Sequence, residues 1–310
     1  MSDDAVRFTA VAKKFDATVA LAGLTFDVGR GEMFGLIGPD GAGKTTAIRL
    51  LCGLLHPDAG TVRVLGVDPV RGRAKVTAGV GYLSQRFSLY GDLTIDENIE
   101  FFADLHGVRD YRPRRDQLLE MTRLTPFRDR LASKLSGGMK QKLALACTLV
   151  HEPALVVLDE PTTGVDPISR REFWKLLSEF LARGVTIVMS TPYLDEAERC
   201  SRVALMHEGQ VLAMDEPGRL RQQLSGGMVE VVAAEAAAAV DAVAALDGVV
   251  DARTFGDRLH VRLTREGAAA VDAFAAAVRP VLADADVRAV QPSLEDVFIA
   301  TLEDKERVHA

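Results

Sequence analysis

A glycine-rich segment, GPDGAGKTT at residues 38–46, constrains the fold of this chain more than any other stretch. It follows the apolar run MFGLI at residues 33–37 and precedes a helical pattern, so it is expected to join a buried strand to a helix. Four residues match the pattern G-x-x-x-x-G-K-[ST], namely Gly38, Gly43, Lys44 and Thr45. Such a loop surrounds phosphate oxygens with backbone N–H groups and the N-terminus of the next helix. It indicates that the chain binds a nucleoside triphosphate.

The residues of this loop have distinct expected roles. Lys44 can reach the β- and γ-phosphates, and the hydroxyl of Thr45 can ligate Mg²⁺. The nucleotide is expected to contact the whole loop, which comprises Gly38, Pro39, Asp40, Gly41, Ala42, Gly43, Lys44, Thr45 and Thr46. The alternative is a strand-to-helix turn that only happens to contain Lys-Thr, and the patterns on both sides of the loop argue against it.

Length and composition bound the class of protein. At 310 residues the chain is long enough for two domains. Its net charge of −7 argues against nucleic acid as a main partner, because it implies no broad basic surface. Three cysteines that are far apart fit a reducing compartment without disulfides. No window approaches the roughly 18 apolar residues of a membrane span, and no signal peptide is visible, so we expect a cytoplasmic polypeptide.

The order of apolar and helical patterns predicts two domains, residues 1–222 and 223–310. Short apolar runs alternate with helical patterns in the first, which is typical of an α/β sheet domain. Helical patterns follow one another without a strand from about residue 94 to 150, which indicates a helical subdomain. The second domain is richer in alanine and valine, and its predicted order is strand, helix, strand, strand, helix, strand. That order suggests a small α+β module of ferredoxin-like type, interpreted as a regulatory or dimer-supporting appendage.

A second glycine motif, LSGGM at residues 135–139, opens a helix predicted to run to about residue 150. Ser136 is placed as its N-cap, and Gly137 and Gly138 let the free N–H groups of the helix approach a phosphate closely. The same five letters recur at residues 224–228, but the residues after them read as a strand. Without a helix N-terminus the second copy has no dipole to aim at a phosphate, so we interpret it as the domain linker.

With this motif the chain resembles the ATP-binding cassette (ABC) family, whose signature is LSGGQ or a near variant, here with Met139 in the fifth place. The resemblance implies a P-loop NTPase fold of ABC type that binds ATP with Mg²⁺. It also implies that Ser136, Gly137 and Gly138 of one subunit close over the γ-phosphate held by the phosphate loop of a second subunit. The phosphate loop alone would leave kinases, GTPases and helicases open.

An apolar strand followed by two carboxylates, ALVVLDEP at residues 154–161, resembles the Walker B motif of the same family. Its carboxyl end is expected beside the phosphate loop, where ligands of α/β sheets collect. The resemblance implies that Asp159 holds Mg²⁺, directly or through water, and that Glu160 is the general base that polarises the attacking water. The alternative, two acids that only cap a strand, would place charge beside a wholly apolar strand without a use for it.

Further positions match the family by order and spacing. The resemblance implies that the amide of Gln85 touches Mg²⁺ and the attacking water, and that residues 86–93 face a membrane partner. Phe15 stands where the family keeps an aromatic ring that stacks on adenine, although an aromatic at a turn is often part of the core. Asp166 falls in the loop that joins the two subunits, and it can also cap the helix that begins at Pro167.

One position departs from the family pattern. The family usually places a histidine that contacts the γ-phosphate after the strand at residues 185–189, whereas this chain has Pro192 in the string STPY. Proline has no N–H to donate. A lost hydrogen bond to a charged group is worth roughly 1.5–3 kcal/mol, which would slow hydrolysis about 10- to 150-fold. Since Glu160 is present, we expect attenuated rather than absent hydrolysis, with Thr191 or Tyr193 covering part of the role.

The resemblance spans residues 5 to about 222, and the rest of the chain resembles the accessory domain of some exporter ATPases. It implies the ATPase subunit of an ABC exporter, peripheral on the inner face of the cell membrane. Its expected partners are a second ATP-binding subunit, taken to be an identical chain, and a separately encoded transmembrane permease. Two alternatives are a soluble ABC ATPase that acts on ribosomes or DNA, and an ATP-binding switch that barely turns over.

Overall fold

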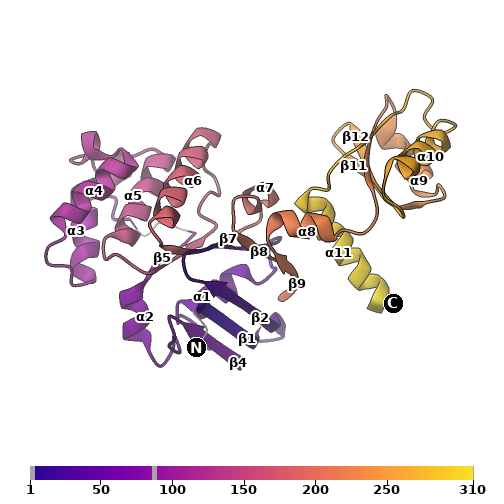
Figure 1. The fold of residues 1–310 in the computed structure, drawn as a ribbon. Helices are drawn as coiled ribbons and strands as arrows, with labels where there is room; N and C mark the ends of the chain where they lie inside the picture. The colour runs from indigo at the N-terminus through magenta and orange to yellow at the C-terminus, as the bar shows by residue number, and fades with distance from the viewer. Residues whose placement is uncertain (1–3, 86–88, 310) are drawn as a thin grey trace. The chain divides into compact units, whose positions relative to one another are not determined.

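A computed structural model describes residues 4–85 and 89–309 and divides the chain into two compact units, Met1–Pro217 and Gly218–Ala310 (Figure 1). The division falls earlier than the boundary after residue 222 that the sequence suggests. The reason is that nearly all of helix α8 (Pro217–Gln223) belongs by its contacts to the second unit. Residues 86–88, part of the segment expected to face a membrane partner, lie outside the described residues.

The first unit is built around a six-stranded sheet of order β5-β6-β7-β3-β8-β9. Its strands are β5 (Val80–Leu83), β6 (Leu155–Asp159), β7 (Thr186–Thr191), β3 (Met33–Ile37), β8 (Arg202–His207) and β9 (Gln210–Asp215). All neighbours pair in parallel except β8 and β9. β3, β6 and β7 are buried at every residue, which explains their continuous apolar runs. Their carboxyl ends meet at one edge of the sheet, and this confirms the expected α/β fold.

A second, antiparallel sheet in the first unit has the order β2-β1-β4. Its strands are β1 (Asp4–Phe15), β2 (Thr18–Gly29) and β4 (Ala59–Val64). The pairing of β1 with β2 contains several register shifts, and such bulges interrupt the alternation from which strands are predicted. Stacked rings connect the two sheets, because Phe26 lies 4.5 Å from Phe8 and 5.4 Å from Phe34 between ring centroids.

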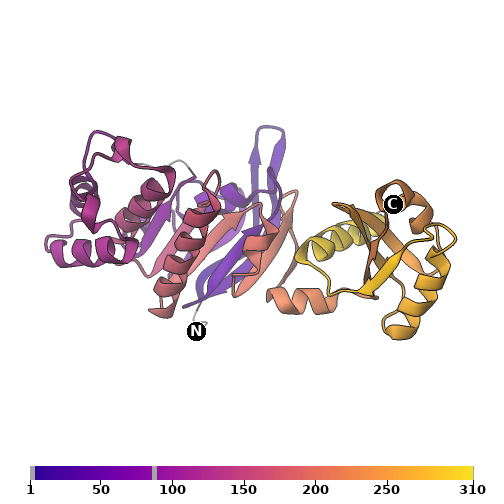
Figure 2. The same ribbon diagram turned by 90° about the horizontal axis from the view of Figure 1, so that it is seen from above.

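Helices cover the central sheet and form a separate helical region between β5 and β6. The helices of the first unit, apart from the first residue of α8, are α1 (Lys44–Leu51), α2 (Arg73–Gly79), α3 (Ile95–Leu105), α4 (Arg112–Thr122), α5 (Gly137–Leu149), α6 (Pro167–Ala182) and α7 (Leu194–Ala197), with short 3-10 turns at Thr125–Phe127 and Ala132–Lys134. Thr94 and Glu97 form a capping box at the start of α3. Figure 2 shows the magenta helices at the end of the unit, apart from the indigo strands.

The second unit contains an antiparallel sheet of order β11-β12-β10-β13. Its elements are β10 (Met228–Val232), a 3-10 turn (Ala236–Ala239), α9 (Val240–Ala244), β11 (Val249–Phe255), β12 (Arg258–Leu263), α10 (Ala268–Val278), β13 (Asp286–Ala289) and α11 (Leu294–His309). Up to β13 this is the order of strands and helices that the sequence predicts. One face of the sheet packs in an apolar core with Phe274 and Val278 of α10. Alternate residues of β12 meet α11 instead, since His260 lies 3.2 Å from Asp296.

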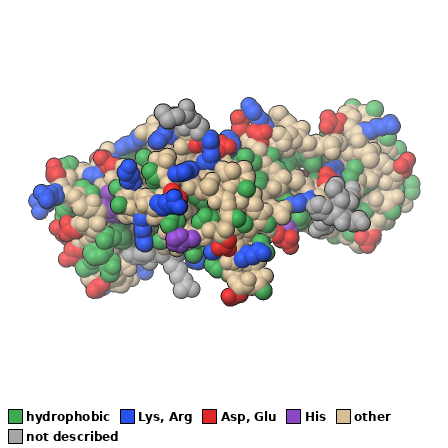
Figure 3. All heavy atoms as spheres, turned by 90° about the horizontal axis from the view of Figure 1, so that it is seen from below, with side chains coloured by type: hydrophobic (Ala, Val, Ile, Leu, Met, Phe, Trp, Pro, Cys, Tyr) green, Lys and Arg blue, Asp and Glu red, His purple; other side chains and the backbone are tan. Residues whose placement is uncertain are grey.

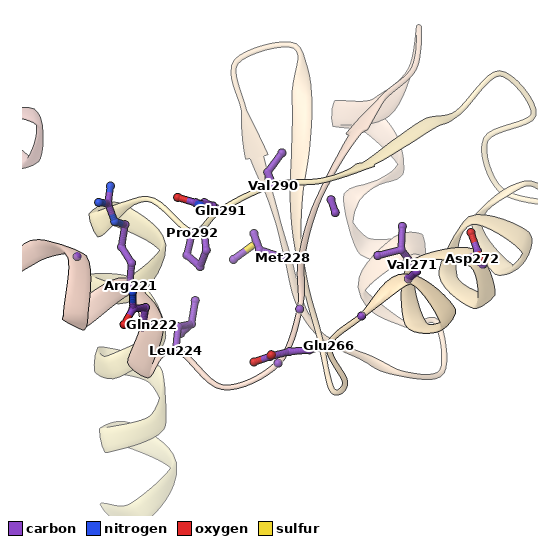
Figure 4. A pocket seen from close by; sticks show the side chains of 16 residues that line it. Arg221, Gln222, Leu224, Met228, Glu266, Val271, Asp272, Val290, Gln291 and Pro292 are labelled. Atoms are coloured by element: carbon purple, nitrogen blue, oxygen red, sulfur yellow. The ribbon is translucent and has the colours of Figure 1, made fainter.

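The second LSGGM copy starts no helix, as expected, but it joins α8 to β10 inside the second unit, so its interpretation as the domain linker is wrong. Gly226 has φ +90°, and a Cβ placed there would lie 1.9 Å from the carbonyl oxygen of Leu263. The N–H of Gly227 donates to Arg265 O at 3.1 Å, and Gly227 O accepts from the N–H of Leu263 at 2.7 Å. Glycine is therefore required here by close backbone packing. Leu224 and Met228 line one cavity of this unit with residues of α8 and α10 (Figure 4).

Candidate functional site

The segment at residues 38–46 leaves the end of β3 and leads into α1, as expected. The side chain of Lys44 is only 4% exposed. Its Nζ donates to the carbonyl oxygens of Gly38 at 2.8 Å and Pro39 at 2.9 Å, so the ammonium lies beneath the loop. A Cβ at Gly38 would lie 2.2 Å from Met206 O, and one at Gly43 would lie 2.6 Å from Ala20 O. Both glycines are therefore required by the close approach of neighbouring backbone.

The two carboxylates at the end of β6 contact this loop. Oδ1 of Asp159 accepts hydrogen bonds from Thr45 Oγ1 at 3.0 Å and from Ser190 Oγ at 2.6 Å. Oε1 of Glu160 lies 3.4 Å from Lys44 Nζ, and its Oε2 accepts from Gln85 Nε2 at 3.0 Å. The structure thus brings together the three residues expected to be catalytic, Lys44, Gln85 and Glu160, although they come from three separate segments.

The backbone of Glu160 is held in a sparsely populated conformation, with φ +48°. Its N–H donates to both Ser190 O and Ser190 Oγ, each at 3.1 Å. Ser190 therefore contacts the carboxylate of Asp159 through its hydroxyl and also holds the backbone of Glu160. Sequence reasoning did not single out Ser190, and its position at the end of a neighbouring parallel strand is the signal that could have revealed it.

These side chains border an open cavity of about 600 Å³. It is lined by Thr18, Val19, Ala20, Asp40, Gly41, Gly43, Lys44, Thr45, Thr46, Gln85, Glu160, Thr163, Pro192 and Tyr193. The contribution of β2 and of Thr163 was not anticipated. Phe15 is 43% exposed at the end of β1, where it pairs with Thr18, so its expected contact with adenine stays a prediction. Ala42 is buried, and its carbonyl oxygen accepts from the N–H of Gly209 at 3.1 Å.

The first LSGGM copy begins α5, and none of its residues is among the described residues that line the cavity. Ser136 is the N-cap, and its Oγ accepts from the N–H of Met139 at 3.3 Å. Gly137 is exposed, and a Cβ there would meet nothing within 4 Å, whereas one at Gly138 would lie 2.2 Å from Ser169 Oγ. The N-terminus of α5 therefore packs against the start of α6 and leaves Gly137 open to an approaching group.

Asp166 caps α6, as expected. Its Oδ1 accepts from the N–H groups of Ser169 at 3.0 Å and Ile168 at 3.1 Å. These backbone donors, that of Ser169 first, hold the pKa of the Asp166 carboxyl below its usual range. The start of α6 is thus fixed next to the start of α5.

The two residues beside Pro192 have different surroundings. The hydroxyl of Thr191 donates to Glu196 Oε2 at 2.7 Å, and the residue is fully buried. Tyr193 lines the cavity, and the guanidinium of Arg170 lies 4.9 Å from the centroid of its ring. Of the two residues expected to compensate for the missing histidine, Tyr193 is the one that borders the cavity.

Comparisons with known proteins agree with the family resemblance of the sequence motifs. A family profile described as ABC transporter matches residues 21–163. The Escherichia coli K12 protein YbhF, named a probable multidrug ABC transporter ATP-binding protein, is 49% identical over 230 residues, which cover 73% of this chain and 40% of YbhF. The chain thus spans less than half the length of that relative. The daunorubicin resistance ATP-binding protein DrrA2 of Streptomyces coeruleorubidus is 38% identical over 96% of this chain and 95% of its own.

A solved structure described as the ATP binding subunit of an ABC transporter has a TM-score of 0.65 and 32% sequence identity. The match covers 70% of this chain and 92% of that one. Within the described residues, no helix is long and apolar enough to cross a membrane.

Proposed function

Because this chain belongs to the ABC transporter family, we propose that it is the ATP-binding and ATP-hydrolysing subunit of an exporter whose permease is a separate protein. The observation that carries the proposal is the convergence of Lys44, Gln85 and Glu160 on one cavity bounded by the phosphate loop. The names of the relatives, multidrug transport and daunorubicin resistance, support export as the direction of transport.

Hydrolysis would proceed by positioning and electrostatic stabilisation, as in other phosphoryl transfers to water. The amides of residues 38–46 and the ammonium of Lys44 would hold the phosphates of the substrate ATP. Glu160 would polarise the attacking water. The amide of Gln85 donates to Oε2 of Glu160 at 3.0 Å and would orient that carboxylate. Asp159 would hold the phosphate loop through Thr45, and Ser190 would hold the backbone of Glu160.

The oxygen atoms of Thr45 and Asp159, 3.0 Å apart, are the ligand type that a small hard cation prefers, so they fit Mg²⁺. We propose that these two residues, with the amide of Gln85, hold the ion. When bound, Mg²⁺ supplies positive charge to the β- and γ-phosphate oxygens. The hydroxyl of Ser190 donates at 2.6 Å to the same oxygen of Asp159 as Thr45 does, and it would fix that carboxylate beside Thr45.

A second copy of the chain would complete the site. Ser136, Gly137 and Gly138 lie outside the cavity lining formed by the described residues, while Gly137 is open to an approaching phosphate. We propose that they contact the γ-phosphate on the partner subunit, with Asp166 at the junction between the two subunits.

The permease would dock at an exposed apolar group on the helical region. Tyr90, Phe101 and Leu105 are 45%, 37% and 67% exposed, and the rings of Tyr90 and Phe101 lie 4.5 Å apart. Figure 3 shows hydrophobic side chains gathered at the end of the unit that carries α3 and α4. Tyr90 follows Gln85 by five residues, which supports a connection between a permease docked here, at the inner face of the membrane, and the catalytic cavity.

The proposal is tested first by Glu160→Gln. Loss of a general base lowers turnover by about 10²- to 10⁴-fold, so phosphate release should fall by that factor while binding of a fluorescent ATP analogue is retained. Equal phosphate release by the variant and the natural chain would contradict the assignment of Glu160.

The effect of the proline is tested by Pro192→His. A histidine restores a donor to the γ-phosphate, and we expect hydrolysis to rise about 10- to 150-fold, the value of one such hydrogen bond. Equal rates for the two proteins would mean that another side chain already supplies the contact.

Recovery of the chain with ribosomes and without a membrane protein would contradict the exporter assignment.

A further inference from the structure

One buried carboxylate of the first unit takes no part in the proposed hydrolysis, yet it contacts three segments of the site. Glu196, in α7, is 1% exposed. Its Oε1 accepts from Thr162 Oγ1 at 2.6 Å, and its Oε2 accepts from Thr191 Oγ1 at 2.7 Å. The Nε of Arg170 lies 3.7 Å from Oε1. Each carboxylate oxygen therefore accepts a hydrogen bond from a hydroxyl, and the guanidinium of Arg170 lies beside Oε1.

Each partner belongs to a different functional segment. Thr162 lies two residues after Glu160 on the chain. Thr191 precedes Pro192, and its carbonyl oxygen accepts from the N–H of Gly38 at 3.3 Å. Glu196 thus ties the segment after the general base to the strand end beside the phosphate loop.

Arg170 connects this group to the surface expected to meet the second subunit. It lies in the first turn of α6, and its N–H donates to Asp166 O at 2.9 Å. A carboxylate accepts hydrogen bonds but does not donate them, so both hydroxyls must donate to Glu196, which fixes their direction. Arg170 and Glu196 thus form a series of contacts from the Asp166 loop to the strand end beside the phosphate loop.

We propose that Glu196 is a positioning residue that couples contact with the second subunit at the Asp166 loop to ATP hydrolysis. This inference rests on the proposed function. It has particular weight in this chain because Pro192 cannot donate a hydrogen bond. Tyr193 borders the cavity instead, with its N–H on Thr191 Oγ1 at 3.1 Å and its ring beside Arg170. Of these two neighbours, Thr191 donates a hydrogen bond to Glu196 and Arg170 lies 3.7 Å from its Oε1.

The test uses Glu196→Gln in the full-length chain, because glutamine keeps the shape and removes the charge. Asp195→Asn, on the exposed neighbour in α7, is the matched control. We expect kcat to fall at least about 10-fold in the Glu196 variant, the size of one hydrogen bond to a charged group. The KM for ATP, binding of a fluorescent ATP analogue and the melting temperature should stay near those of the control.

Coupling is measured by a double-mutant cycle with Asp166→Ala. We expect Asp166→Ala to lower kcat in the natural chain and to have little further effect in the Glu196→Gln background. Multiplicative effects would overturn the proposal, as would an unchanged kcat. The proposal is also overturned if ATP binding weakens by the same factor as kcat, or if the melting temperature falls below that of Asp195→Asn, because either result would indicate a purely structural role.

A second readout separates this inference from the proposed function. If the natural chain releases phosphate no faster than Glu160→Gln, the proposed hydrolysis fails. ATP-dependent dimer formation, followed by gel filtration, then decides the coupling. A weaker dimer for Glu196→Gln than for Asp195→Asn supports the proposal, and equal dimer formation overturns it.

Discussion

The pentapeptide LSGGM occurs at residues 135–139 and again at 224–228, and the two copies have different structures. In the first, Ser136 caps the 13-residue helix α5. In the second, Met228 begins strand β10. The residues that follow account for the difference, since KQKLALACTL favours a helix and VEVV, rich in β-branched valine, favours a strand. The structure that this short motif adopts therefore depends on the residues that follow it.

The two copies also require glycine for different physical reasons. Gly137 is open to its surroundings, which leaves room for a ligand, whereas Gly226 packs against the backbone oxygen of Leu263. In the first copy glycine leaves space for an approaching group, and in the second it lets two backbone segments of one unit come together. Substitutions at matched positions can separate these two uses.

The largest effect is expected for Gly226→Ala. Its positive φ and the close carbonyl of Leu263 should together cost about 2–5 kcal/mol of unfolding free energy. Denaturant unfolding should show the loss in the second unit, with ATP binding unchanged. Gly256→Ala, at φ +63° with nothing within 4 Å of its Cβ, is the control for backbone strain alone. Equal losses in both variants would rule out a contribution from the contact with Leu263.

Next in size is Gly137→Ala. The added methyl group has space within the chain, so stability should stay the same or rise slightly. Hydrolysis should fall about 10²-fold, because a small displacement of the amides from the γ-phosphate of the partner subunit has that effect. Phosphate release and melting temperature are measured together. Gly218→Ala, an open glycine in the first turn of α8, serves as the control, and an equal loss of hydrolysis in both would contradict the role given to Gly137.

The two methionines should also differ. Met228 is buried at 7% exposure, and Met228→Gln would bury an amide in the second unit at about 1–3 kcal/mol. Met139→Gln creates the more usual signature, and it should change hydrolysis only a few-fold because Ser136 and the backbone make the expected phosphate contacts. Thermal unfolding and phosphate release check the pair. A larger loss of stability at position 139 than at 228 would reverse the comparison.

The smallest effect on stability is expected at the serines. Ser136→Ala removes an N-cap, which is worth about 1 kcal/mol, whereas Ser225→Ala should stay within about 0.5 kcal/mol. Hydrogen exchange at the N–H of Met139, the donor to Ser136 Oγ, reports the loss directly. Unchanged exchange in Ser136→Ala would show that the cap does not protect the start of α5.

The proximity of the residues expected to be catalytic could be predicted because motifs at the ends of parallel strands share one edge of the sheet. Ser190 and Glu196 could not, because their hydrogen bonds depend on which strands are neighbours, and the sequence does not specify that order. The bulged strands β1 and β2 are longer than the runs at residues 6–10 and 24–28 that the sequence predicts as strands, since register shifts interrupt the alternation. The residues of β2 that line the cavity were missed for the same reason.

Pro192 has a consequence for the response of the site to acidity. The cavity lining formed by the described residues contains no histidine. An imidazole is the side chain whose charge ordinarily changes between about pH 5 and 8, so a site with a switch histidine carries a proton-sensitive group next to the γ-phosphate. This chain has a ring without a titratable atom at that place. Its turnover should therefore lack the pH dependence near neutrality that the titration of an imidazole would introduce.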